Sequence, residues 1–257
     1  MKQAKLFVYF LVISISLSSL NLSNRAITIT QLPYYDSTIQ IDGVLNQNEW
    51  YSAYDIPVEN EAQQLLFILY LQNDRDYLYV AVDDIYDITD NKSGGDYDQD
   101  HIYLYFDTDN NQALSEGHDD AVEIWGDGAV IHGVVNTSLP TKYMQVADLT
   151  FFNVITAFTS SINGSFPHRT AEFKIALSLL SSAIFGFACV IREVGIGQVL
   201  RYPQTIVVIT NQSAYQTFEL GGISNNNPYY LILGIGGGTV VGIGIFILIK
   251  KQFGRKG

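Results

Sequence analysis

Hydrophobic and polar positions divide this chain of 257 residues into three zones. Residues 6–20 and 230–249 are continuous apolar runs, each edged by basic residues. Between them, apolar residues mostly alternate with polar ones, which is the period of a half-buried β-strand. Aromatic and β-branched residues fill the alternating runs, and clusters of Gly, Asn and Asp separate them. The central zone is therefore predicted to be strand and turn.

The pattern predicts ten strands and two short helical turns. The strands are expected at residues 38–42, 65–72, 77–83, 101–107, 121–126, 129–135, 151–158, 170–176, 185–192 and 205–210. The helical turns are expected at 46–53 and 177–183. Many short strands with turn residues between them indicate an all-β fold, an antiparallel β-sandwich of the jelly-roll kind.

The two apolar ends predict export and membrane anchoring. The first run is short and follows two lysines, as in a secretory signal peptide, which we assign to residues 1–25. The second is long enough to cross a bilayer, so we expect a transmembrane helix at 229–249. The basic tail at 250–257 then lies in the cytoplasm by the positive-inside rule. The chain is expected to be a single-pass cell-membrane protein.

This arrangement places one domain, residues 26–220, outside the cell on a short polar stalk at 221–228. Three glycines spaced four apart on one face of the apolar helix allow close approach of a second helix. A homodimer through Gly234, Gly238 and Gly242 is therefore a candidate. Four Asn-X-Ser or Asn-X-Thr sequons in predicted turns also make the domain a candidate glycoprotein.

The charge limits which classes of partner are expected, and the cysteine content limits which covalent bonds can stabilise the domain. Without residues 1–25 and 250–257, the chain keeps 7 Lys and Arg against 26 Asp and Glu, a net charge of −19. Nucleic acid is not an expected partner, because phosphate binding needs clustered Lys and Arg. Cys189 is the only cysteine, so no disulfide can form within the chain, and its apolar, alternating surroundings predict a buried thiol. A bound metal ion is one candidate for the stabilising link that a disulfide would otherwise provide.

Acidic residues gather in one part of the chain. Sixteen of the 26 lie between Asp74 and Asp127, in turns between apolar strands. Alternating oxygen-bearing side chains in a tight turn converge on one point, and Ca²⁺ takes six to eight oxygen ligands. We therefore predict a calcium site with the candidate ligands Asp107, Asp109, Asn111, Glu116, Asp119 and Asp120. The alternative is a solvated loop in which Asp and Asn only favour the turn.

A second acidic stretch is a weaker metal candidate. It consists of Asp83, Asp84 and Asp87, with Asp90 and the acids of 96–100 nearby. The first stretch is not an EF-hand, because Gln112 stands where that motif needs a glycine and His118 where it needs a bidentate glutamate.

Several motifs occur in a recognisable order. Residues 41–45 read IDGVL and are followed by Glu49-Trp50. The later motifs are LYVAVDD at 78–84, DHIYLYFD at 100–107 and AEFKIAL at 171–177. This order resembles the family 9 carbohydrate-binding modules and the wider DOMON-like superfamily, over about residues 38–210. The resemblance implies a jelly-roll-like sandwich that is often calcium-binding and, in its best-known members, binds sugars.

Aromatic residues are the candidates for sugar contact, because sugar C–H patches stack on rings while hydroxyls need polar partners. Of the two tryptophans, Trp50 is predicted to be core, which leaves no paired-tryptophan clamp. Trp125 is a candidate platform, with core packing as the alternative. Tyr103 and Tyr105, on one predicted strand, complete the candidate ligand-binding set.

The function predicted is a calcium-stabilised, non-catalytic carbohydrate-binding module anchored to the cell surface, which binds carbohydrate or a surface glycoprotein. The chain lacks G-x-S-x-G, H-E-x-x-H and a phosphate-binding glycine loop, so no catalytic residue is assigned. One alternative is an adhesive protein that binds another protein through the same sandwich. A haem-binding DOMON domain that uses Met144 and a histidine is a weaker one.

Overall fold

The computed structural model describes residues 28–91, 99–116, 118–139, 142–195, 197–206 and 211–222. These residues belong to one compact unit, Ile27–Asn225. The predicted signal peptide, the transmembrane helix with its three glycines, and the basic tail lie outside the described residues. The helices that are described are all too short or too polar to cross a bilayer.

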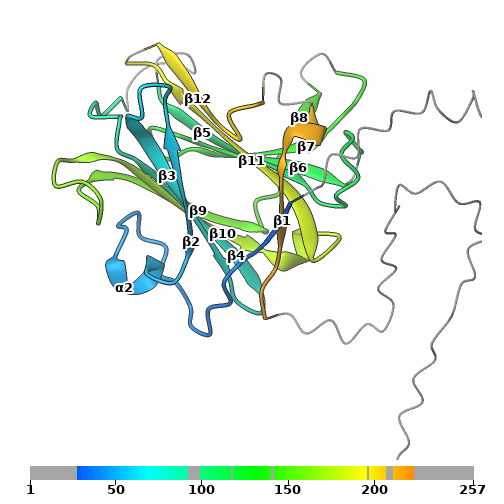
Figure 1. Cartoon of the computed structure of the whole chain (residues 1–257). Coiled ribbons are helices and arrows are strands. Elements are labelled where there is room, and N and C mark those ends of the chain that lie inside the picture. Colours follow the sequence, from blue (N-terminus) through cyan, green and yellow to red (C-terminus); the bar gives the residue numbers. More distant parts are fainter. Residues whose placement is uncertain are drawn as a thin grey trace, which may run out of the picture. The chain divides into compact units, whose positions relative to one another are not determined.

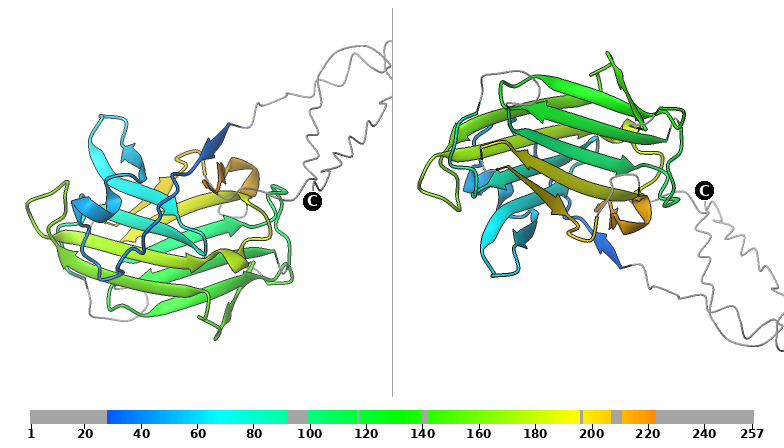
Figure 2. Two further views of the ribbon diagram at one scale, coloured as in Figure 1. Left: turned by 90° about the horizontal axis from the view of Figure 1, so that it is seen from below. Right: turned by 90° about the horizontal axis from the view of Figure 1, so that it is seen from above.

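Two β-sheets face each other, which confirms the predicted all-β sandwich (Figures 1 and 2). The smaller sheet has the order β2-β3-β4-β10-β9. Its strands are β2 (Tyr54–Glu59), β3 (Leu65–Asn73), β4 (Tyr77–Asp84), β10 (His168–Ala176) and β9 (Phe152–Thr159). Every neighbouring pair in this sheet is antiparallel.

The larger sheet has eight strands in the order β1-β13-β11-β5-β6-β7-β8, and β12 also pairs with β11. Its strands are β1 (Ile29–Gln31), β13 (Gln216–Glu219), β11 (Ile184–Glu193), β5 (His101–Asp107), β6 (Asp119–Trp125), β7 (Val130–Val135), β8 (Tyr143–Val146) and β12 (Gln198–Tyr202). The described helical segments are α2 (Gln47–Trp50), η1 (Leu177–Leu179) and η2 (Gln212–Ala214). Among the strands described, β1 and β13 are the pair that runs in parallel, and every other pair in this sheet is antiparallel.

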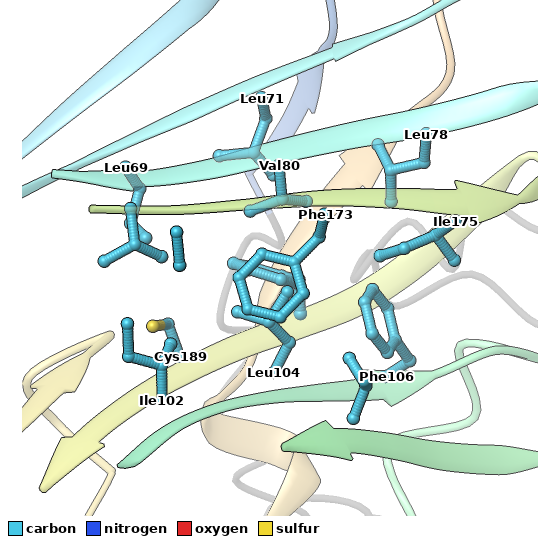
Figure 3. Packing of buried hydrophobic residues seen from close by; sticks show 14 of the residues in the cluster. Leu69, Leu71, Leu78, Val80, Ile102, Leu104, Phe106, Phe173, Ile175 and Cys189 are labelled. Carbon is cyan, nitrogen blue, oxygen red and sulfur yellow. The ribbon is translucent and has the colours of Figure 1, made fainter. Parts of the chain in front are cut away.

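The core lies between the sheets and is filled by every second residue of the central strands. Leu71, Val80 and Phe173 point inward from the five-stranded sheet and meet Leu104 and Cys189 from the other sheet (Figure 3). All five are fully buried, which confirms the buried thiol at Cys189. A fully buried aliphatic or aromatic side chain contributes about 1.5–3 kcal/mol, so this layer is the main source of stability.

The strand predicted at 38–42 is wrong, because this segment has no strand pairing. Ile39 and Ile41 instead pack on the outer face of β3 and β4, so their alternation comes from covering a sheet. Residues 205 and 206, at the start of another predicted strand, lie in a turn, and 207–210 are outside the described residues. The short strands β1, β2, β8, β12 and β13 were not predicted.

The IDG and Glu-Trp motifs attach this covering segment to the sheet. Trp50 is 1% exposed, and its Nε1 donates to Glu172 Oε1 at 2.9 Å. Glu172 Oε2 accepts the backbone N–H groups of Asp42 at 2.9 Å and Gly43 at 2.8 Å. Gly43 has φ +81°, and a Cβ there would lie 2.9 Å from that of Ala157. The motif is therefore structural, and Trp50 is core as predicted.

Candidate functional site

A row of aromatic side chains lies on the outer face of the eight-stranded sheet. Alternation along β5 puts His101, Tyr103 and Tyr105 on that face, opposite the core residues of the same strand. The rings of His101 and Tyr103 stack at 5.8 Å between centroids with 6° between planes. Tyr103 and Tyr105 stack at 6.1 Å and 10°. The strand geometry therefore turns three separate residues into one continuous row.

The neighbouring strand β6 adds an indole and a carboxylate to this row. By register, Trp125 lies opposite His101 and Glu123 lies opposite Tyr103. The Trp125 ring is 5.1 Å from that of His101. Trp125 Nε1 donates to Glu123 Oε1 at 2.6 Å, and the same oxygen is 2.5 Å from His101 Nδ1. Glu123 therefore fixes the orientation of both rings.

A positively charged side chain, Arg192 of β11, lies on the other side of the row. Arg192 lies opposite His101 by register. Burial and then the neighbouring Glu123 raise the pKa of Tyr103 well above its ordinary value, while Arg192 opposes this change. The Tyr103 hydroxyl is therefore close to both the Glu123 carboxylate and the Arg192 guanidinium. Rings, carboxylate, hydroxyl and guanidinium together form a surface that can stack on apolar patches and bond to hydroxyl groups.

Exposure separates the three predicted ligand-binding residues. Tyr103 and Trp125 are half-buried and keep part of their rings at the surface. Tyr105 is 6% exposed and packs against Tyr143, with ring centroids 5.5 Å apart, so it lies at the covered end of the row. Glu123 and Arg192 are half-buried members of the site that sequence reasoning missed.

The loop after β5 brings three of the predicted calcium ligands together. Carboxylate oxygens of Asp107, Asp109 and Asp119 all lie within 4.8 Å of one another. The turn wraps its backbone around Asp107, whose two oxygens accept N–H groups of Asn111 at 3.1 Å and Gln112 at 2.8 Å. The loop therefore converges as an oxygen-lined turn, as predicted from its alternating acids.

The geometry of this loop fits a cation. Asp119 is 1% exposed, and its Oδ1 has no hydrogen-bond partner among the described residues. Burial, together with Asp109 and Asp119, raises the pKa of Asp107 to about 6 against the lowering effect of the backbone donors. The three acids therefore repel one another in the absence of a cation, and calcium, which prefers carboxylate oxygens, would remove this repulsion.

The other predicted ligands have different partners. Glu116 accepts the N–H and hydroxyl of Thr137 at 2.9 and 2.7 Å. Asp120 Oδ1 is 2.7 Å from Nε2 of His132. Asn111 Nδ2 donates to Asp109 Oδ2 at 2.8 Å, so this amide orients one of the three clustered carboxylates.

The second acidic stretch divides between the two sides of its sheet. Asp83 faces outward, where its oxygens contact His168 at 2.6 Å and Ser161 at 2.7 Å. Asp84 faces inward, and its carboxylate lies with those of Asp87 and Glu193 within 4.8 Å. Asp90 has an oxygen 3.9 Å from the Arg169 guanidinium, and residues 96–98 lie outside the described residues.

Comparisons with solved structures identify the fold. The chain is similar to a family 9 carbohydrate-binding module from Caldicellulosiruptor kristjanssonii in complex with glucose, with 17% identity and a TM-score of 0.54, covering 77% of this chain and 100% of that one. A module of the same family and organism in complex with cellotriose gives 20% identity and a TM-score of 0.53, covering 79% and 98%. No protein-family model and no curated protein matches the chain. The chain has the β-sandwich fold of family 9 carbohydrate-binding modules, which confirms the resemblance found in its motifs.

Proposed function

We propose that this protein is a non-catalytic carbohydrate-binding module, held at the cell surface by its C-terminal apolar segment. The observation that carries the proposal is the outward-facing group of Tyr103, Glu123, Trp125 and Arg192. Ring faces stack on the C–H patches of a sugar, and the charged groups bond to its hydroxyls. The fold supports this function, because the two similar modules were solved with glucose and cellotriose.

Calcium has a stabilising part in this proposal. Asp107 and Asp119 belong to paired strands, since they are opposite each other in the β5–β6 register, and Asp109 lies in the loop between them. An ion held by all three would join the ends of two central strands. It would replace the disulfide that a chain with one cysteine cannot form.

Membrane anchoring is proposed from the sequence alone. The apolar segment at 229–249 and the basic tail after it are typical of a single span with an outward-facing domain. In this arrangement the module would hold an external polysaccharide or the glycans of neighbouring surface proteins close to the membrane.

A glycan-binding experiment with the full-length chain in mild detergent tests the function. The first probes are glucose and cellotriose, followed by a glycan array. We expect Tyr103→Ala and Trp125→Ala each to weaken binding at least about ten-fold, equivalent to about 1.4 kcal/mol, because each removes a stacking face.

Tyr51→Ala is the matched control, since Tyr51 is 82% exposed and lies outside the aromatic row. Its affinity should equal that of the wild type. Absence of binding to every glycan, or an equal loss in the Tyr51 variant, would contradict the proposed site.

A further inference from the structure

A pocket opens on the outer face of the five-stranded sheet, on the opposite side of the sandwich from the aromatic row. Its volume is about 380 Å³, which is enough for one long side chain. Segments that are far apart in the sequence line it: α2 and the residues after it, the strands β2 and β3, and the β9–β10 loop at 160–167. The pairing of β2 with β3 and the position of that loop therefore create the pocket.

The inner lining of this pocket is aromatic and apolar. Tyr70 is 6% exposed, and its ring lies 6.1 Å from that of the buried Trp50, measured between centroids. Ile162, in the β9–β10 loop, is 40% exposed and adds an apolar wall. Surfaces of this kind pack well against the methylene groups of a long charged side chain, whose end stays in a polar environment.

A buried network fixes the orientation of the Asn163 amide, which also lines the pocket. Asn163 Nδ2 donates to the Tyr70 hydroxyl and, at 2.7 Å, to Oδ2 of Asp83. Asp83 is fully buried, and its oxygens also contact Ser161 Oγ at 2.7 Å and His168 Nε2 at 2.6 Å. Because these bonds use the two donors of the amide nitrogen, Oδ1 is the atom that Asn163 can offer to a ligand.

The charge of the lining is negative. Asp55 is exposed and lies opposite Tyr70 in the β2–β3 register. Among the described residues that line the pocket, it is the one charged side chain. Burial, together with the charges of Asp83 and Asp55, raises the pKa of Tyr70 against the lowering effect of the Asn163 hydrogen bond. The pocket therefore favours a ligand that is positively charged and donates hydrogen bonds.

We propose that this pocket binds a lysine or arginine side chain of a partner protein. The methylene groups of that side chain would pack along Tyr70 and Ile162, and its charged end would bond to the Asp55 carboxylate and to Oδ1 of Asn163. The aromatic ring adds a favourable interaction with the cation. The net charge of −19 between residues 26 and 249 attracts a basic partner, while a neutral sugar lacks the positive charge that this lining favours.

The test titrates the full-length chain in mild detergent with Nα-acetyl-arginine amide and Nα-acetyl-lysine amide, and calorimetry and NMR measure the binding. We expect Asp55→Asn to weaken binding of the tighter probe at least about five-fold, because it removes the charged acceptor of the pocket. Glu61→Gln is the matched control, since Glu61 is exposed, lies in the turn after β2 and is not part of the pocket lining. It changes the net charge equally and should leave the affinity unchanged. A thermal melt checks that both variants are folded.

Three results would overturn the proposal. The first is a wild type that binds neither probe, and the second is an equal loss of affinity in the Asp55 and Glu61 variants. The third is tighter binding of glucosamine than of either amino-acid probe, which would assign the pocket to an amino sugar. The pocket shares no residue with the aromatic row, and the probes contain no sugar. A failure of the proposed carbohydrate function would therefore leave this test unaffected.

Discussion

Two buried glutamates, Glu172 and Glu193, differ in how many hydrogen-bond donors surround their carboxylates. Glu172 is fully buried under the segment that covers the five-stranded sheet, and it accepts three N–H groups from Asp42, Gly43 and Trp50. Glu193 is 1% exposed between the sheets, and its Oε1 has no partner among the described residues. Burial raises the pKa of both, but only Glu172 has donors that lower it again.

The difference teaches that burial of an acid does not by itself indicate its role. Glu172 has the donors it needs from its own chain, so its role is to hold the covering segment. Glu193 has an acid, Asp84, where a donor should be. The number of satisfied oxygens therefore separates a carboxyl group on which the fold depends from one that a neutral side chain can replace, and the following predictions test that separation.

The largest effect is expected at Glu172. Glu172→Ala leaves three buried N–H groups without an acceptor, so the free energy of unfolding should fall by about 3–5 kcal/mol, equally with calcium and with chelator. Glu172→Gln, which keeps one acceptor oxygen, should lose less. Denaturant unfolding in both buffers measures this, and a calcium-dependent loss would break the comparison.

Glu193→Gln should behave in the opposite way. Burial and the neighbouring Asp84 raise the pKa of Glu193 to about 12, so its carboxyl group is protonated at neutral pH and glutamine has nearly the same shape and charge. The free energy of unfolding should stay the same or rise by about 1 kcal/mol, because the amide can donate to the Asp84 carboxylate. Denaturant unfolding measures this change, and a loss of about 3 kcal/mol or more would assign Glu193 the role of Glu172.

The paired histidines should make stability fall as pH rises. Burial lowers the pKa of His132 and His168, but bonds to Asp120 and Asp83 and to backbone carbonyls outweigh it and raise both values. A histidine whose pKa is raised in the folded state stabilises the protein at pH values below its unfolded pKa of about 6.5. This stabilisation is lost as the pH rises through the folded pKa. In chelator, the melting temperature should therefore fall between about pH 6 and pH 9. A combined His132→Gln and His168→Gln variant should flatten most of that slope.

The smallest effect is expected in the acidic loop. Asp109 is half-exposed and water can solvate it, in contrast to Asp84. Asp109→Asn in chelator should change the free energy of unfolding by no more than about 0.5 kcal/mol. With calcium, the variant should lose the stabilisation that we propose an ion gives to this loop. A large loss in chelator would show that Asp109 already has an essential partner within the protein.

The sequence predicted most of the fold and part of the site. Alternation located the central strands and the buried Cys189, and spacing alone indicated that Asp107 and Asp109 converge. It misassigned residues 38–42, because an extended segment that covers a sheet has the same alternation as a strand. It also missed the burial of Glu193 beside Asp84, since nothing local distinguishes this acid from any other at the end of a strand.

The order of apolar and polar residues was enough to determine a two-sheet sandwich, the tryptophan anchor at Trp50 and an acidic turn, because these depend on neighbours along the chain. Only the tertiary structure decided that Arg192, Tyr103 and Glu123 share one face and that Glu193 meets Asp84. Those contacts depend on the pairing of β11 with β5 and on the packing of one sheet against the other. Strand pairing joins residues that are far apart in sequence, and a local pattern contains no information about which strands will be neighbours.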